Sequence, residues 1–277
     1  MTGNFLKCVA LAILIAGAFA ARAAGEEWTK ATFVCPICGA VNTFQSVTGT
    51  PADVYGGAGK LQYVFWPAMD KRVIYSCKRC RYTVYMGDWN AIPHEKSELI
   101  HAALKKLTTD TNVSDYTTIP MSARFDMAEK IYIAWGKDAA FMCAFYRACA
   151  WHLDGEQKAA EAAAARMKAL DIAAKMLSTE LKAGARKELL FISGSLKHFM
   201  GHAGALEDLK AAKAIAYEDE KDLLAPGIRR DQYLTKLIDE LIVIAKKAYN
   251  EEGAKEEKKS EAAAAKDEKT ADSPAAK

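Results

Sequence analysis

The chain has 277 residues, and 38 lysines and arginines stand against 35 aspartates and glutamates, so its formal net charge is only +3. A charge so close to balance excludes a molecule that binds polyanions over its whole surface. The length allows one large domain or two smaller domains, each with a core of its own.

The first residues have the pattern of a signal peptide. An uncharged apolar run follows Lys7 and ends at Ala20, and Ala21 and Ala23 then form a small-residue cleavage site. The run is shorter than the roughly 20 residues that a membrane-spanning helix needs. We therefore expect residues 1–24 to be removed, and the protein to be exported to the periplasm or the cell exterior without a transmembrane span. The alternative is an uncleaved N-terminal anchor.

Residues 25–94 are predicted to form a small antiparallel β domain. Four stretches are rich in β-branched and aromatic residues, as strands are: residues 28–34, 61–66, 71–76 and 81–86. Each Cys-x-x-Cys pair lies where two strand-like runs meet, so we expect two hairpins with the cysteines at their tips. The glycine-rich stretch 56–59 between the pairs predicts a loop insertion.

The four cysteines of these pairs, Cys35, Cys38, Cys77 and Cys80, have the spacing of a zinc site. Two residues between ligands let both thiolates of a pair reach one ion at about 2.3 Å. Gly39 is suited to the positive φ that such a turn needs after its second cysteine, whereas Arg81 at the matching position would have to accept strain. The resulting interpretation is structural Zn2+ held in two rubredoxin-like knuckles.

Two other uses of the cysteines stay open. An exported chain meets an oxidising compartment, so the four sulfurs could form structural disulfides. A thioredoxin-like redox centre is disfavoured, because such a pair normally opens a helix and here both pairs continue as strands.

Basic residues crowd the second pair. Lys78, Arg79 and Arg81 would suit a surface that binds nucleic acid, or they would balance the charge of four thiolates on one zinc ion. Export favours charge balance, and we expect no nucleic-acid partner.

From residue 95 the hydrophobic period becomes helical. We expect a helix and linker over residues 95–118, and a domain of helical hairpins over residues 119–250. The charged, alanine-rich helices after Gly155 and Gly201 are similar to a tetratricopeptide repeat, but their spacing exceeds the usual period of about 34 residues, so a plain helical bundle stays open. One predicted core stripe consists of Ala163, Met167, Leu170, Ala174, Leu177 and Leu181. Residues 251–277 have no aromatic or branched aliphatic side chain and are expected to be a disordered tail of alanine, lysine and glutamate.

Several other residues have patterns that suggest a site. His198 and His202 have the helical spacing of two metal ligands but lack a third. Cys143 and Cys149 are about 9 Å apart along one predicted helix, too far for a disulfide, and are expected in the core. His152 is expected to be a core histidine bonded to a carbonyl group.

Four blocks of the sequence occur in an order that resembles a known bacterial family. They are FVCPICGAVNTFQSV, VIYSCKRCRYTVYMGDW, IPMSARFDMAEKIYIAWGKDAAFMCAFYRACAWHLDGE and LLFISGSLKHFMGH. The chain is similar to domain-of-unknown-function family 2225, in which two Cys-pair knuckles precede tetratricopeptide-like helices. The resemblance implies that Cys35, Cys38, Cys77 and Cys80 are the metal positions. The chain departs from the family pattern at Lys78 and Arg81, where that pattern has proline and glycine.

No catalytic motif is present, neither a nucleophile elbow nor Ser-x-x-Lys nor His-Glu-x-x-His. The sequence therefore favours an α+β protein in which a zinc ribbon precedes an all-α, tetratricopeptide-like domain. Its function would be that of an exported scaffold or interaction module whose helical surface binds a protein or peptide. The alternative is an exported enzyme or thiol–disulfide redox factor that uses the Cys pairs.

Overall fold

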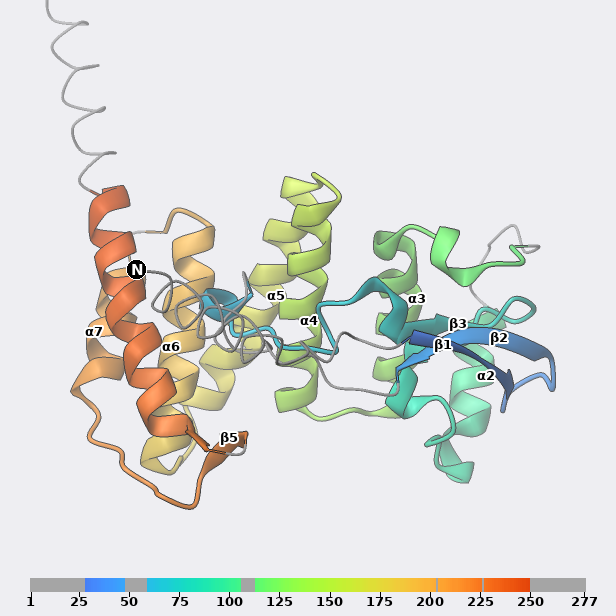
Figure 1. Cartoon of the computed structure of the whole chain (residues 1–277), viewed down its shortest axis with the longest axis horizontal. Helices are drawn as coiled ribbons and strands as arrows, with labels where there is room; N and C mark the ends of the chain where they lie inside the picture. The colour runs from blue at the N-terminus through green and yellow to red at the C-terminus, as the bar shows by residue number, and fades with distance from the viewer. Residues whose placement is uncertain (1–27, 48–58, 106–112, 203, 226, 250–277) are drawn as a thin grey trace, which may run out of the picture. The chain divides into compact units, whose positions relative to one another are not determined.

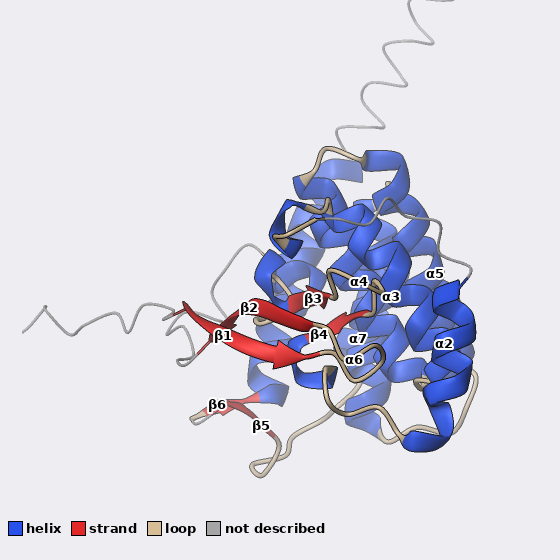
Figure 2. Ribbon diagram, turned by 90° about the vertical axis from the view of Figure 1, so that its right-hand side faces the viewer, coloured by secondary structure: helices blue, strands red, loops and turns tan. Residues whose placement is uncertain are grey.

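The computed structural model describes residues 28–47, 59–105, 113–202, 204–225 and 227–249. The predicted signal peptide and tail lie outside these residues. Short antiparallel strand pairs are followed by a helical region, which confirms the broad α+β class (Figure 2). Within the described residues, no helix is both long and apolar enough to span a bilayer.

The chain divides into two compact units, and neither unit corresponds to a predicted domain. Unit 1 contains the first two strands together with Asp70–Trp135, and unit 2 contains Ala58–Met69 together with the chain from Gly136 onward. The predicted boundaries after residues 94 and 118 therefore do not separate the units. The chain passes from unit 1 into unit 2 and back before it finally leaves unit 1.

Unit 1 contains two hairpins whose tips carry the cysteine pairs. In the first hairpin, β1 (Trp28–Val34) pairs with β2 (Val41–Val47), and Val34 lies opposite Val41. In the second, β3 (Ile74–Ser76) pairs with β4 (Thr83–Tyr85), and Ser76 lies opposite Thr83. We call the connecting segments Cys turn 1 (residues 35–40) and Cys turn 2 (residues 77–82). The predicted position of the cysteines at hairpin tips is thus confirmed.

A cluster of aromatic rings forms the core beneath these hairpins. Phe44 of β2 stacks on Tyr75 of β3 with ring centroids 4.2 Å apart, and the edges of Trp89 and Tyr116 meet Phe44 at 4.7 and 4.9 Å. All four rings are buried. Because each two-stranded sheet is too small to be stable alone, this shared cluster is what joins the two hairpins.

The part of unit 1 that the structure describes also contains the α-helices α2 (Ser97–Lys105) and α3 (Met121–Trp135). The buried guanidinium of Arg124 on α3 donates to the carbonyls of Lys71, at 2.5 Å, and Ile74, at 3.0 Å. The Tyr132 hydroxyl donates to the Asp88 carboxylate at 2.8 Å. Helix α3 is therefore attached to the second hairpin by buried polar contacts, although its sequence predicted that it would belong with the later helices.

Unit 2 contains a series of helices, of which the first four each pack on the next along the chain (Figure 1). They are α4 (Ala139–Gly155), α5 (Ala159–Leu177), α6 (Ala183–Phe199), α7 (Ala205–Ala214) and the helix at residues 230–249. A small pair of strands, β5 (Leu223–Ala225) and β6 (Ile228–Arg229), precedes the last helix. Short connections between long helices explain this pairwise packing.

The predicted core stripe lies on a different face of α5 from the one that is buried. Met167 is 49% exposed, and the buried positions of α5 are Ala162, Ala165, Arg166, Ala169 and Ala173. Small side chains let neighbouring helices approach closely, so an alanine stripe can be buried in place of a stripe of larger residues. Hydrophobic size alone therefore identified the wrong face.

The segment between the two hairpins is an integral part of the helical core. Tyr63 and Val64 are each only 4% exposed. The Tyr63 ring meets Phe191 of α6 edge-on at 5.6 Å, and the Tyr63 carbonyl accepts from Arg147 of α4 at 2.9 Å. The Ala68 carbonyl lies 2.8 Å from His152 Nε2, which confirms the predicted carbonyl-bonded histidine.

The strand predicted over residues 61–66 is absent. These residues belong to a 3-10 helix, Lys60–Gln62, and the turns that follow it, with Tyr63 in the left-handed region at φ 56°. The aromatic content that predicted a strand here serves to fill the helical core instead, because side-chain burial outweighs local propensity.

We expect Tyr63→Ala to destabilise unit 2 by about 3–5 kcal/mol, the usual cost of removing a large buried ring. Urea unfolding followed by the helical circular dichroism signal measures it. Tyr249→Ala, which truncates a 58% exposed tyrosine of the same unit, is the matched control and should change stability by less than about 0.5 kcal/mol. Equal effects of the two variants would contradict the integral role of the segment.

Candidate metal centre

The two Cys turns have the same backbone hydrogen bonds. In turn 1, the Cys35 amide donates to the Ala40 carbonyl at 2.9 Å and the Gly39 amide to the Cys35 carbonyl at 3.0 Å. In turn 2, Cys77 donates to Tyr82 at 2.8 Å and Arg81 to Cys77 at 3.1 Å. The two turns are therefore repeats of one local structure, each closing its hairpin and directing two sulfurs to the same side.

Both turns need a left-handed residue directly after their second cysteine. Gly39 has φ 70° and Arg81 has φ 63°. A glycine adopts this conformation freely, whereas a side chain costs roughly 1–2 kcal/mol there. Arg81 thus carries the strain that its sequence position predicted, and its side chain is only 3% exposed.

The four predicted ligands converge. The Sγ atoms of Cys35 and Cys80 are 3.6 Å apart, those of Cys38 and Cys77 are 3.7 Å apart, and all four lie within 4.8 Å of one another. Four sulfurs about 2.3 Å from one ion at tetrahedral corners would be roughly 3.8 Å apart. A disulfide would need about 2.0 Å, and no cysteine in the described residues forms a disulfide. The cluster therefore has the donor atoms and the spacing to hold a metal ion.

The hydrogen bonds among the thiols of the cluster favour ionisation of Cys77 and oppose ionisation of Cys35 and Cys80. Hydrogen bonds from Cys35 and Cys80 hold the pKa of the Cys77 thiol far below its ordinary value. The hydrogen bond with Cys77 raises the pKa of Cys35 to about 12. Hydrogen bonds to Cys35 and Cys77, followed by burial, hold the pKa of Cys80 far above the ordinary value. Ionising Cys35, Cys77 and Cys80 together is therefore unfavourable without a cation among them, and a soft divalent metal would supply one.

Asn42 connects the two turns and was not predicted from sequence. Its buried side chain accepts from the Lys78 amide at 2.9 Å, and it donates to the Ala40 carbonyl at 2.9 Å and towards the Cys77 Sγ at 3.6 Å. The Arg79 amide also points at this sulfur, 3.4 Å away. Cys77 thus receives two N–H donors that stabilise a thiolate, and one amide side chain sets the distance between the turns.

Two further side chains hold the turns from outside. Trp89 Nε1 donates to the carbonyl of Val34, directly before Cys35, at 3.1 Å. The Thr83 hydroxyl donates to the Arg81 carbonyl at 2.8 Å, which holds the strained residue of turn 2. Both side chains are buried and support the cluster from beneath the two turns.

The basic residues near turn 2 do not form one exposed patch. Arg81 is buried, and Arg72 forms an ion pair with Asp70 at 2.5 Å. Lys78 and Arg79 remain exposed at the turn itself. Their position next to the sulfurs is consistent with local charge balance.

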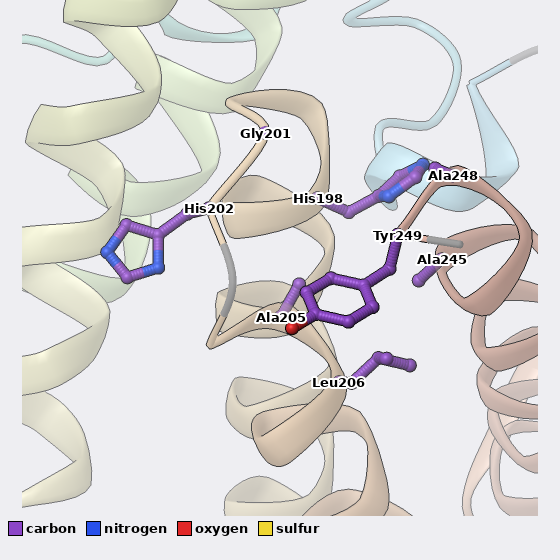
Figure 3. Close-up of a pocket in the computed structure, with 8 residues that line it drawn as sticks. All are labelled: His198, Gly201, His202, Ala205, Leu206, Ala245, Ala248 and Tyr249. Carbon is purple, nitrogen blue, oxygen red and sulfur yellow. The ribbon is translucent and has the colours of Figure 1, made fainter. Parts of the chain in front are cut away.

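The other candidate residues do not assemble a second metal site in the described part of the chain. His198 and His202 line a shallow pocket of about 110 Å³, but their imidazoles point to opposite sides (Figure 3). Cys143 and Cys149 are both buried and form no disulfide, as predicted for core thiols.

The chain matches no family model, no curated protein and no solved structure. The resemblance to family 2225 therefore stays a prediction, and the geometry of the cluster carries the functional argument.

Gly39→Ala should weaken zinc binding by about tenfold, because it costs roughly 1–2 kcal/mol to hold alanine in the left-handed region. A Cβ there meets nothing within 4 Å, so strain is the only change. Gly87→Ala is the control: its Cβ also meets nothing, and its φ is ordinary. Competition with a chromophoric chelator measures both affinities, and equal values would refute the role of the turn conformation.

Asn42→Ala should weaken zinc binding by about 10- to 100-fold, the usual effect of losing a residue that supports metal ligands. The neighbouring exposed Thr43→Ala should bind zinc like the wild-type protein. Competition with the chromophoric chelator measures both zinc affinities, and circular dichroism verifies that the zinc-loaded variants are folded. An unchanged affinity for Asn42→Ala would show that the two turns position themselves without it.

Proposed function

We propose that the protein is an exported zinc-binding scaffold, in which one structural Zn2+ held by Cys35, Cys38, Cys77 and Cys80 stabilises the strand unit. The observation that carries the proposal is the convergence of four sulfurs within 4.8 Å at the tips of two hairpins. Four thiolates complete a tetrahedron and leave no position for a substrate, as in structural zinc sites. The zinc-ribbon assignment of these hairpins belongs to the same proposal.

The helical unit would supply the interaction surface. Helices that pack successively on their neighbours, as α4 to α7 do, suit a tetratricopeptide-like array, and such arrays present extended surfaces to proteins or peptides. Val243 and Tyr249 on the last helix are 68% and 58% exposed, which supports contact with an apolar partner. We infer a protein or peptide partner from this surface.

The second candidate function is that of an exported thiol–disulfide redox factor. The free state of all four cysteines, of which Cys38 and Cys80 are not fully buried, supports thiol chemistry. Against it, the short Sγ–Sγ distances join cysteines of different pairs. Both pairs also continue as strands, without the helix that lowers a catalytic thiol pKa in redox proteins.

Analysis of native protein from its own compartment tests the proposal. Mass spectrometry should find a chain that begins within a few residues of Ala24, and elemental analysis should find one zinc per chain. Cys35→Ser should lose the zinc, because three thiolates and a hydroxyl form a weaker site. Cys143→Ser, which removes a buried thiol outside the cluster, is the matched control and should retain it.

A metal-free native chain with the four cysteines in disulfides would refute the zinc proposal. Disulfide reductase activity lost in Cys38→Ser would favour the redox alternative. An intact N-terminus in cytoplasmic protein would refute export.

A further inference from the structure

A second site lies in unit 2, away from the cysteine cluster. A pocket of about 200 Å³ opens among α4, α5 and α6. Its apolar wall includes Met176, Leu189 and Ile192, and its polar side chains are Cys143, Arg147 and Glu188. An apolar pocket with a few convergent polar groups is the usual form of a small-molecule site.

Arg147 is the unusual member of this wall. Its side chain is 8% exposed, its Nη1 donates to the Tyr63 carbonyl at 2.9 Å, and its Nε has no hydrogen-bond partner. Within the described residues it forms no ion pair, whereas the equally buried Arg166 pairs with Asp154. A guanidinium is always charged, and buried charges are normally paired. In the part of the chain that the structure describes, this buried cation of the pocket thus has no anionic partner.

Glu188 does not serve as that partner. Its carboxylate lies 3.4 Å from Arg230, which also pairs with Asp222 at 3.1 Å. Its negative charge stands at the same pocket, however, and would repel a second anionic group on a ligand. The two charges together favour a ligand with one negative end and an uncharged body.

The size of the pocket limits that body. A dry protein cavity of about 150 Å³ holds benzene, with six heavy atoms, so this pocket suits a molecule of roughly six to ten heavy atoms. Met176, Leu189 and Ile192 offer an aliphatic surface to such a molecule.

We propose that this pocket binds a short aliphatic monocarboxylate, with its carboxylate on the Arg147 guanidinium and its chain against Met176, Leu189 and Ile192. The site requires neither the zinc cluster nor a protein partner, so it goes beyond the scaffold function. The ligand carboxylate would accept hydrogen bonds from the part of the Arg147 guanidinium that lines the pocket, and charge-assisted bonds of this kind are the strong ones.

Hexanoate is the probe, titrated by calorimetry into full-length mature protein with its metal. Hexanol and hexylammonium have the same chain with a neutral and a positive end, and adipate has a second carboxylate. We expect hexanoate to bind at least tenfold more tightly than each of the three. Arg147→Gln should weaken hexanoate by at least tenfold and bring it level with hexanol.

A second variant keeps the test valid if Arg147→Gln folds poorly, since Arg147 also holds the Tyr63 carbonyl. Ala185 lines the pocket and is exposed, so Ala185→Leu should obstruct the pocket with the fold intact and weaken hexanoate by at least tenfold. Ala174→Leu, at an exposed position of α5 outside the pocket, is the matched control and should bind hexanoate like the wild-type protein.

Three outcomes would overturn the proposal. They are no hexanoate binding at millimolar concentration, equal affinity for hexanoate and hexanol in the wild-type protein, and an unchanged affinity in Ala185→Leu. The first denies the site, the second denies the role of charge, and the third places the binding elsewhere.

Discussion

The convergence of four cysteine sulfurs is the constraint on which unit 1 depends. The hairpins are short, with seven-residue strands in the first and three-residue strands in the second. Neither is a stable fold alone, and the cysteine cluster joins their tips while the aromatic rings join their flanks. Because the cluster favours a thiolate at Cys77 and opposes one at Cys35 and Cys80, a cation at the tips would be needed for these sulfurs to ionise together. A metal bound there would therefore contribute its binding free energy directly to folding.

The connection between the two hairpin tips also affects the stability of α3. Arg124 bonds to carbonyls just before and within β3, and the Tyr132 hydroxyl bonds to the Asp88 carboxylate soon after β4. Both side chains are fully buried, so their hydrogen bonds require the second hairpin to be in place. Removal of a metal bound at the cluster would therefore loosen α3 along with the strands, whereas the chain's hydrophobic pattern had grouped α3 with the later helices.

Whether a feature could be predicted from the sequence depends on how far apart in the chain the residues that determine it lie. The cysteine cluster depends on spacing within six-residue turns, and both turns and their hairpins were predicted. Asn42 had a local signal that was overlooked: it stands on the inner face of β2 beside buried Phe44, where an apolar residue is expected. Tyr63 had none, because its partners Arg147 and Phe191 lie more than 80 residues away in the chain. The core stripe predicted for α5 was wrong for a third reason. Close packing between helices favours small side chains, which hydrophobicity scales rank low.

The excursion of Ala58–Met69 into unit 2 has a consequence for biosynthesis. All of unit 1 has been made once Trp135 is synthesised. Tyr63, in contrast, contacts Phe191, and its hydroxyl accepts from Arg230 at 3.3 Å. At the usual 5–20 residues per second, the ribosome needs about 8–30 s to make the roughly 160 residues from Met69 to Arg230. For that interval the stretch LQYVFW has no core to enter, and it is the part of the nascent chain that a chaperone would be expected to cover.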